Sequence, residues 1–134
     1  MRYVLDTNVL ISGALFPDSA PGRALRVALR EGTVLASAET LAEVAEVLGR
    51  PKLDRYLTWN EREEFLAALA RRVEIVQPET QVQMCRDPDD DCIVELAIDG
   101  KADLIVTGDR DLLSLSVIRG VRIVTPARFI GESP

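Results

Sequence analysis

The sequence predicts an α/β protein with a mainly parallel sheet of about five strands. Short runs of aliphatic and β-branched residues alternate along the chain with longer segments whose apolar residues recur at helical spacing. Continuous apolar strands are typical of parallel sheets covered by helices on both faces. Two of the runs end on or near an acid, Asp6 and Asp109. Because such sheets bind ligands at the carboxyl ends of their strands, the fold prediction also indicates a candidate site.

Each predicted strand is a short, mostly continuous apolar run, too short to be a helix of ordinary length. Parallel strands of one sheet are joined by helices in right-handed crossovers, which accounts for the alternation of the two patterns. Five strands in one sheet is the simplest count. The five runs are residues 3–5, 34–36, 73–76, 104–106 and 121–124.

Asp6 follows the first strand and has two interpretations. Asp6, Thr7 and Asn8 precede an apolar run, and aspartate is a common N-terminal cap of a helix. A carboxylate at the end of a buried strand is also a candidate ligand for a divalent cation. Its position in the sequence favours neither interpretation.

Helices are predicted between the strands from apolar spacing and from end signals. Pro21 suits the first helical position before residues 22–30. Apolar residues between Leu41 and Leu48 follow the i, i+3, i+4, i+7 pattern of one helix face, and Gly49 ends that pattern.

A further helix, which follows a connector at residues 50–54, is predicted to run through Phe65, Leu66, Leu69 and Ala70 and to end before the strand at Val73. Two capping boxes could start it, one pairing Thr58 with Glu61 and the other pairing Asn60 with Glu63.

Composition indicates a globular protein with an aliphatic core. At 134 residues, with 47% apolar and 28% charged residues, we expect residues 1–134 to form one domain. The net charge of −6 argues against a broad basic surface for nucleic acid but does not exclude a nucleic-acid substrate, because bound cations change the local electrostatics. The chain has no histidine, so acid–base chemistry would fall to carboxylates, Lys, Tyr or metal-bound water.

No apolar run approaches the roughly 20 residues that span a bilayer, and residues 1–6 are unlike a signal peptide. We therefore expect a cytoplasmic protein without a membrane partner. The two cysteines, Cys85 and Cys92, have no zinc-site spacing, and we interpret both as small apolar residues.

Acids near the middle and end of the chain have both structural and chemical interpretations. Residues 87–91 contain four aspartates directly before a helical pattern that begins at Ile93. One of these acids should cap that helix, and others favour its positive end. Asp109 and Asp111 lie in a turn-like segment in which acids are ordinary.

Glu39, Glu43 and Glu46 lie together on one face of a predicted helix. This is the usual pattern of a solvated face. Glu39 and Glu43 nevertheless repel one another at i, i+4 spacing unless a cation intervenes, so the face is also compatible with metal binding.

The acids are more informative as a group than singly. Two carboxylates about 5 Å apart at an effective dielectric of about 20 repel by about 3 kcal/mol, so a buried cluster of four needs a cation or protonation. Mg²⁺ and Mn²⁺ prefer oxygen ligands, and the group therefore points to a divalent-cation site.

Four motifs occur in the order and spacing of the PIN domain. They are residues 3–10 (YVLDTNVL), 41–44 (LAEV), 87–90 (DPDD) and 105–112 (IVTGDRDL). Along essentially its whole length, the chain resembles a VapC-like ribonuclease toxin of a type II toxin–antitoxin pair. The resemblance implies a three-layer α/β/α sandwich and a Mg²⁺- or Mn²⁺-dependent ribonuclease.

The resemblance also implies the site residues. The metal-binding and catalytic acids map to Asp6, Glu43, Asp90 and Asp109, with Asp91 as a rival to Asp90 and Asp111 as a ligand through water. Thr7, Asn8 and Thr107 map to polar residues that support these acids. Candidate contacts to RNA phosphates are Arg23, Arg26, Arg30, Arg50 and Arg110.

Metal-activated water would then attack phosphorus in line, leaving 5′-phosphate and 3′-hydroxyl ends. The family further implies a homodimer and a separately encoded antitoxin that covers the acidic groove.

Three other interpretations compete with this one. A PIN fold that has lost catalysis would serve only as a binding module, although all four acids are present. A phosphoacceptor receiver domain would need a lysine after a late strand, and neither Lys52 nor Lys101 is so placed. A phosphatase with Asp6 as nucleophile would need a second acid where the chain has Asn8.

Overall fold

A six-stranded sheet forms the centre of the molecule. The computed structural model describes residues 1–83 and 85–132. Strands are parallel in the order β3-β2-β1-β4-β6, and β5 pairs antiparallel with β6 at one edge. The strands are β1 (Arg2–Leu5), β2 (Thr33–Ala36), β3 (Glu74–Ile75), β4 (Leu104–Val106), β5 (Val117–Ile118) and β6 (Val121–Val124).

The five predicted strands are all present, and the sequence prediction missed a sixth. This is β5, which turns back into β6 through Arg119 and Gly120, both with positive φ. The predicted strand at residues 73–76 is reduced to the exposed pair in β3. The mainly parallel α/β fold is therefore confirmed, with one antiparallel edge strand added.

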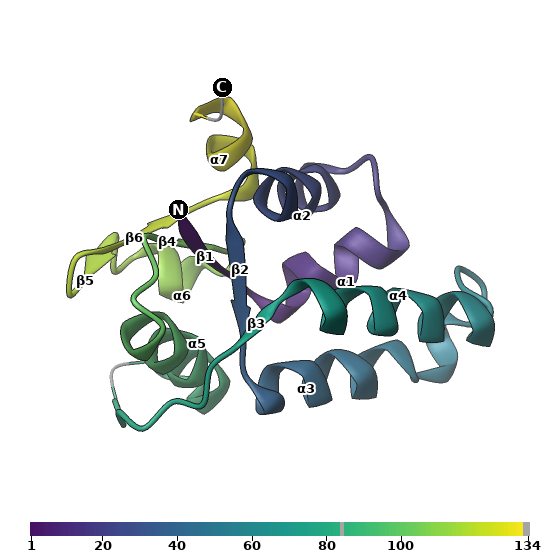
Figure 1. The fold of residues 1–134 in the computed structure, drawn as a ribbon, viewed down its shortest axis with the longest axis horizontal. Helices are drawn as coiled ribbons and strands as arrows, with labels where there is room; N and C mark the ends of the chain where they lie inside the picture. The colour runs from purple at the N-terminus through teal and green to yellow at the C-terminus, as the bar shows by residue number, and fades with distance from the viewer. Residues whose placement is uncertain (84, 133–134) are drawn as a thin grey trace.

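Helices cover both faces of the sheet (Figure 1). Tyr3 and Leu5 point into one apolar core, whereas Val4 points into the other. The first core is closed by α1, α2, α3, α4 and α7, and the second by α5 and α6. This confirms the three-layer α/β/α sandwich. The helices are α1 (Thr7–Leu15), α2 (Ala20–Glu31), α3 (Ala38–Leu48), α4 (Trp59–Arg72), α5 (Pro88–Asp99), α6 (Arg110–Leu113) and α7 (Pro126–Glu132), with a 3₁₀ turn, η1, at Pro51–Leu53.

Local capping explains where the main helices begin. The capping box that starts α4 is the Thr58 and Glu61 pair: the Thr58 hydroxyl accepts from the Glu61 N–H at 3.1 Å, and the Glu61 carboxylate accepts from the Thr58 N–H at 2.9 Å. Pro21 lies in the first turn of α2, at the second helical position rather than the predicted first, because the helix begins at Ala20. Asp87 caps α5 by accepting from the Asp89 N–H at 2.9 Å.

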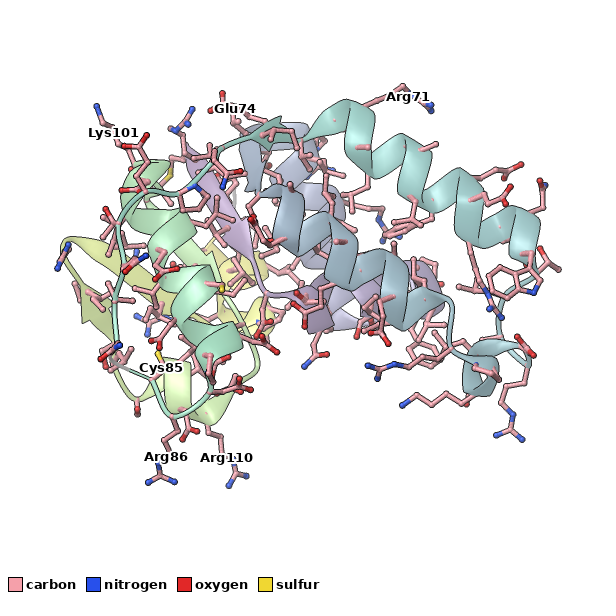
Figure 2. The ribbon with its side chains drawn as sticks, turned by 90° about the horizontal axis from the view of Figure 1, so that it is seen from below. Arg71, Glu74, Cys85, Arg86, Lys101 and Arg110 are labelled. Carbon is pink, nitrogen blue, oxygen red and sulfur yellow. The ribbon has the colours of Figure 1, made fainter. Side chains whose placement is uncertain are left out.

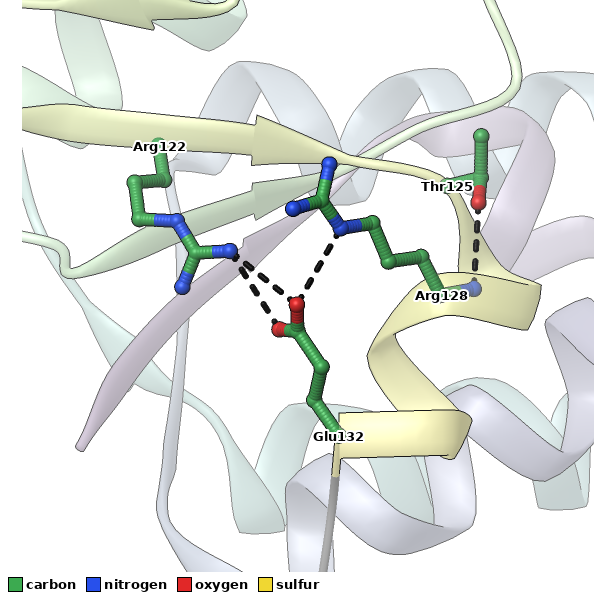
Figure 3. A network of polar contacts seen from close by, with 4 residues as sticks. All are labelled: Arg122, Thr125, Arg128 and Glu132. Carbon is green, nitrogen blue, oxygen red and sulfur yellow. Dashed lines mark hydrogen bonds and ion pairs between the residues drawn. The ribbon is translucent and has the colours of Figure 1, made fainter.

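The last helix, which the sequence prediction did not include, is attached to the sheet by a polar network (Figure 3). The Glu132 carboxylate accepts from Arg122 on β6 at 3.2 Å and from Nε of Arg128 at 3.1 Å. The Thr125 hydroxyl accepts from the Arg128 N–H at 3.1 Å. The ring of Phe129 packs edge-on against that of Tyr3 on β1, so α7 is part of the first core.

The order of the strands reverses between β1 and β4, which are hydrogen-bonded neighbours with Leu5 opposite Val106. Asp6 and Thr107 are the next residues on the two strands. A sheet of this type is open at such a switch point, because the connections on either side lead to opposite faces. Within the described residues, no helix is both long and apolar enough to cross a membrane.

Candidate active site at the carboxyl edge of the sheet

A cleft of about 90 Å³ opens at the switch point, and most of the side chains that line it are acids. The chain ends of β1 and β4 form its floor, α3 forms one wall, and the first turn of α5 forms the other. The residues lining it are Asp6, Thr7, Asn8, Glu43, Asp87, Asp89, Asp90, Ile93 and Asp109. The four acids predicted from the sequence therefore face one cleft, although they come from four separate segments.

Thr107 connects the two acids at the strand ends. Its side chain is fully buried, and its hydroxyl donates to Oδ2 of Asp6 at 2.6 Å and accepts from the Asp109 N–H at 3.0 Å. Asp6 occupies the N-cap position of α1, but its side chain makes no capping hydrogen bond. The Asp6 carboxylate is thus oriented mainly by Thr107, which directly follows β4, and the capping interpretation does not account for it.

Asp109 is both a cap and a cleft residue. Its Oδ1 accepts from the N–H groups of Asp111 and Leu112, at 2.8 and 3.2 Å, in the first turn of α6. This fixes the side chain with its carboxylate at the cleft. Asp111 is exposed on the same turn and is not among the residues that line the cleft.

The three glutamates of α3 have different environments. Glu43 is half-buried in the cleft, where Oε2 accepts from the Thr7 hydroxyl at 3.2 Å. Glu46 pairs with Arg50 at 2.9 Å, and Glu39 is exposed and lines a different cavity. Of the glutamates on this face, Glu43 is therefore the one that the fold directs to the cleft.

Asp90 and Asp91 point in different directions although they are adjacent. Asp90 is buried, with 7% of its surface exposed, and lines the cleft. Asp91 accepts from the Cys85 N–H at 2.9 Å and lines a cavity on the outer side of α5. Both cysteines are free; Cys85 packs against the second core, whereas Cys92 is exposed.

The cleft acids resist ionisation. Burial is the main cause of the raised pKa of Asp90, which is about 6, and the charges of Asp109 and Asp6 raise it further. Burial also raises the pKa of Asp6, opposed by the Thr107 hydrogen bond. For Glu43, burial raises the pKa and the hydrogen bond from Thr7 lowers it. A cation bound in the cleft would relieve the repulsion among these carboxylates and favour their ionised forms.

The donor set suits a hard divalent cation. Its side chains offer carboxylate, hydroxyl and amide oxygens, and such oxygens are the ligands of Mg²⁺ and Mn²⁺. In the part of the chain that the structure describes, however, no group of three or more acids or cysteines is arranged so that it could hold a metal ion as it stands. Binding a cation here would therefore require side-chain movements that draw the carboxylates together.

The arginines that the sequence suggests as contacts to RNA phosphates are distributed unevenly around this site. Arg26 and Arg30 lie on α2 and pair with neighbouring acids, and Arg50 pairs with Glu46. Arg23 is exposed in the first part of α2. This helix begins after the C-terminal end of α1, whereas Asp6 lies at the N-terminal end of α1. Arg110 directly follows Asp109 at the cleft.

The sequence interpretation missed several residues that also matter here. Asp87 and Asp89 line the cleft, and their place in an acid-rich run before a helix was the available signal. Arg86, next to Asp87, was not considered.

Residues 2–111 match the PIN domain family. The chain belongs to the PIN domain family. An uncharacterized protein of Methanocaldococcus jannaschii is 34% identical over 142 residues, an alignment that covers 98% of this chain and 91% of that protein. The match includes all four predicted acids, because each lies within residues 2–111.

Solved structures share the fold. VapBC2 from Rickettsia felis, bound to a DNA fragment from its promoter, aligns with a TM-score of 0.64 and 16% identity, covering 93% of this chain and 98% of that one. PAE2754 from Pyrobaculum aerophilum aligns with a TM-score of 0.63 and 15% identity, covering 98% of this chain and 91% of that one.

PIN domains are generally nucleases, so family membership assigns this chain to the nucleic-acid hydrolases at the level of the family. The receiver-domain and phosphatase interpretations do not fit this family.

Proposed function

We propose that the protein is a Mg²⁺- or Mn²⁺-dependent endoribonuclease. The observation that carries this proposal is the hydrogen-bonded pair of strand ends, in which one buried threonine orients Asp6 and contacts Asp109 at the switch point of a PIN fold. Glu43 and Asp90 face the same cleft from α3 and α5. An acidic cleft of this kind repels a phosphodiester unless a cation is present, so a cation is part of the proposal.

Asp6, Glu43, Asp90 and Asp109 would hold the cation. When bound, it would stabilise the charge on the scissile phosphate and lower the pKa of water so that a nucleophile is available at neutral pH. Thr107 would keep Asp6 ionised and oriented, since its hydroxyl donates to Oδ2. Thr7 would act in the same way on Glu43 through Oε2. Attack in line would leave a 5′-phosphate and a 3′-hydroxyl.

We propose further that the enzyme acts as the toxin of a toxin–antitoxin pair. Family membership supports this, as does the similarity of the fold to VapBC2, whose structure was determined with promoter DNA. The proposed partner is a cognate antitoxin that covers the acidic cleft, and the proposed assembly is a homodimer in the cytoplasm. Coexpression with the product of an adjacent gene, followed by co-purification, tests the partner independently of catalysis.

Cleavage of a panel of labelled single-stranded RNAs in Mg²⁺, Mn²⁺ or EDTA tests the activity. We expect metal-dependent cleavage that disappears in Asp6→Asn. Glu46→Gln is the matched control, because Glu46 is an exposed acid on α3 that does not line the cleft and pairs with Arg50. Equal cleavage by the wild type and Asp6→Asn, or none by the wild type in either metal, would contradict the enzymatic proposal and favour a PIN fold that only binds.

A further inference from the structure

Two exposed arginines stand beside the acidic cleft without a carboxylate partner. Arg86 precedes Asp87, and Arg110 follows Asp109, so each is joined in the chain to an acid that lines the cleft. Figure 2 shows both side chains extending outward in the same direction, at the end of the molecule where α5 begins. They are 24 positions apart in the sequence, and the fold brings them together because α5 and α6 both start at the carboxyl edge of the sheet.

Their lack of partners sets them apart from three of the other arginines predicted to contact RNA, Arg26, Arg30 and Arg50. Within the described residues, neither guanidinium forms an ion pair or hydrogen bond with a side chain. Arg50, by contrast, pairs with Glu46 at 2.9 Å, and Arg26 lies 3.8 Å from Asp18. Acids are abundant in the sequence next to Arg86 and Arg110, yet both arginines are exposed and extend outward in Figure 2. Their donors remain available to a ligand.

We propose that Arg86 and Arg110 bind RNA phosphates next to the scissile phosphate, on the α5 side of the cleft. The inference rests on the proposed ribonuclease function and names the part of the protein that holds the strand. An RNA chain approaching this cleft meets several carboxylates, and a cation in the cleft would neutralise only those nearest to it. Two arginines at the rim would offer the neighbouring phosphates charge-assisted hydrogen bonds, which guanidinium groups form well.

The opposite wall cannot supply the same contact. The charged residues of α3 are all acids. Arg50 follows the helix, pairs with Glu46 and lies about two helical turns beyond Glu43. The strand would therefore be held from one side, by the segments that carry Asp90 and Asp109. Contacts to phosphates fix position without reading bases, so Arg86 and Arg110 would contribute affinity and register rather than sequence preference.

Steady-state cleavage in Mg²⁺ by Arg86→Ala, Arg110→Ala and the double variant tests the proposal. Arg71→Ala is the matched control, since Arg71 is exposed in the last turn of α4 and lies on the opposite side of the molecule in Figure 2. Each single variant should raise KM about five-fold, as expected for one exposed ion pair, and the double variant about 25-fold, with kcat within two-fold of the wild type.

Salt dependence separates phosphate binding from other effects. The slope of log(kcat/KM) against log[salt] should become shallower by about 0.7 for each arginine removed, and Arg→Lys variants should restore it. The loss should be equal for two RNAs of unrelated sequence. A loss confined to one RNA, or a double variant that behaves like Arg71→Ala, would overturn the inference.

Failure of the proposed function gives a different result. A wild-type protein that neither binds nor cleaves RNA would overturn both proposals. Wild-type cleavage combined with an unchanged KM and salt slope in the double variant would overturn the inference about Arg86 and Arg110 alone. Circular dichroism of each variant would confirm that these surface substitutions leave the fold intact.

Discussion

Replacing Thr107 with valine should destabilise the protein and impair the site at the same time. The side chain is fully buried between β4 and the cleft. Its hydroxyl donates to Asp6 at 2.6 Å and accepts from the Asp109 N–H at 3.0 Å. Valine has a similar shape but no hydroxyl, so the change removes both hydrogen bonds while filling the same space.

The expected loss in free energy of unfolding follows from the groups that the two hydrogen bonds join. A hydrogen bond to a charged group contributes about 1.5–3 kcal/mol and an ordinary one about 1 kcal/mol, and leaving buried partners unpaired carries the larger cost. We expect the free energy of unfolding to fall by about 2–4 kcal/mol. Burial already raises the pKa of Asp6, and losing the opposing Thr107 bond should raise it further. Metal affinity or activity should fall about 10–100-fold, as is typical when a group that orients a metal ligand is removed.

Urea denaturation and RNA cleavage measure the two effects, with Thr107→Ser as the control. Serine keeps the hydroxyl and loses only a methyl group, so it should retain most of the activity. If Thr107→Val and Thr107→Ser show the same activity and the same stability, Thr107 serves only as packing and its assigned role is wrong.

Three further predictions concern charge, metal and capping. Without metal, Asp90→Asn should stabilise the protein by about 1–3 kcal/mol at pH 7.5, although it should abolish cleavage. Since Asp90 has a native pKa of about 6, above its usual 3.8, the wild type should lose stability as pH rises from about 4 to about 6; urea midpoints across this range should show a flatter profile for the variant. Mg²⁺ at about 100 times its Kd should stabilise the wild type by about 2.7 kcal/mol, and a thermal shift of equal size in Asp6→Asn would argue against this site. Thr58→Ala should cost about 1 kcal/mol by removing the N-cap of α4; unchanged urea midpoints would show that the capping box contributes nothing.

Much of the fold could be predicted because its strands are buried on both faces. The continuous apolar runs of β1, β2 and β4 have no other stable location than the centre of a layered structure. Prediction was less accurate at the edges of the sheet, where β3 is shorter than predicted and β5 was missed. β3 is exposed, and β5 is a two-residue strand held by its antiparallel neighbour. Such short edge strands leave little hydrophobic pattern in the sequence, because their pairing is decided by tertiary contacts.

The residues of the candidate site also fall into those that could be located from the sequence and those that could not. Asp6 and Asp109 could be located from the sequence, since each follows a buried strand and the ends of neighbouring parallel strands share one edge. Asp90 and Asp91 could not be distinguished, because consecutive helical residues differ by about 100° in direction and only the packing of α5 decides which of them faces inward. The same reasoning applies to Glu43 among the glutamates of α3.

The arginines show the limit most clearly. The sequence identifies each arginine but does not show whether a carboxylate is paired with it. An arginine that is already paired is less available to bind a phosphate. Arg50 and Arg110 were equivalent candidates until the fold paired Arg50 with Glu46 and left Arg110 beside Arg86 at the rim of the cleft. Glu46→Gln would break this pair, but Arg50 lies beyond the end of α3, about two helical turns past Glu43, so freeing it should create no contact to RNA. We expect this variant to leave KM unchanged while the Arg110→Ala variant raises it, and a lower KM in Glu46→Gln would show that the α3 wall also contacts the strand.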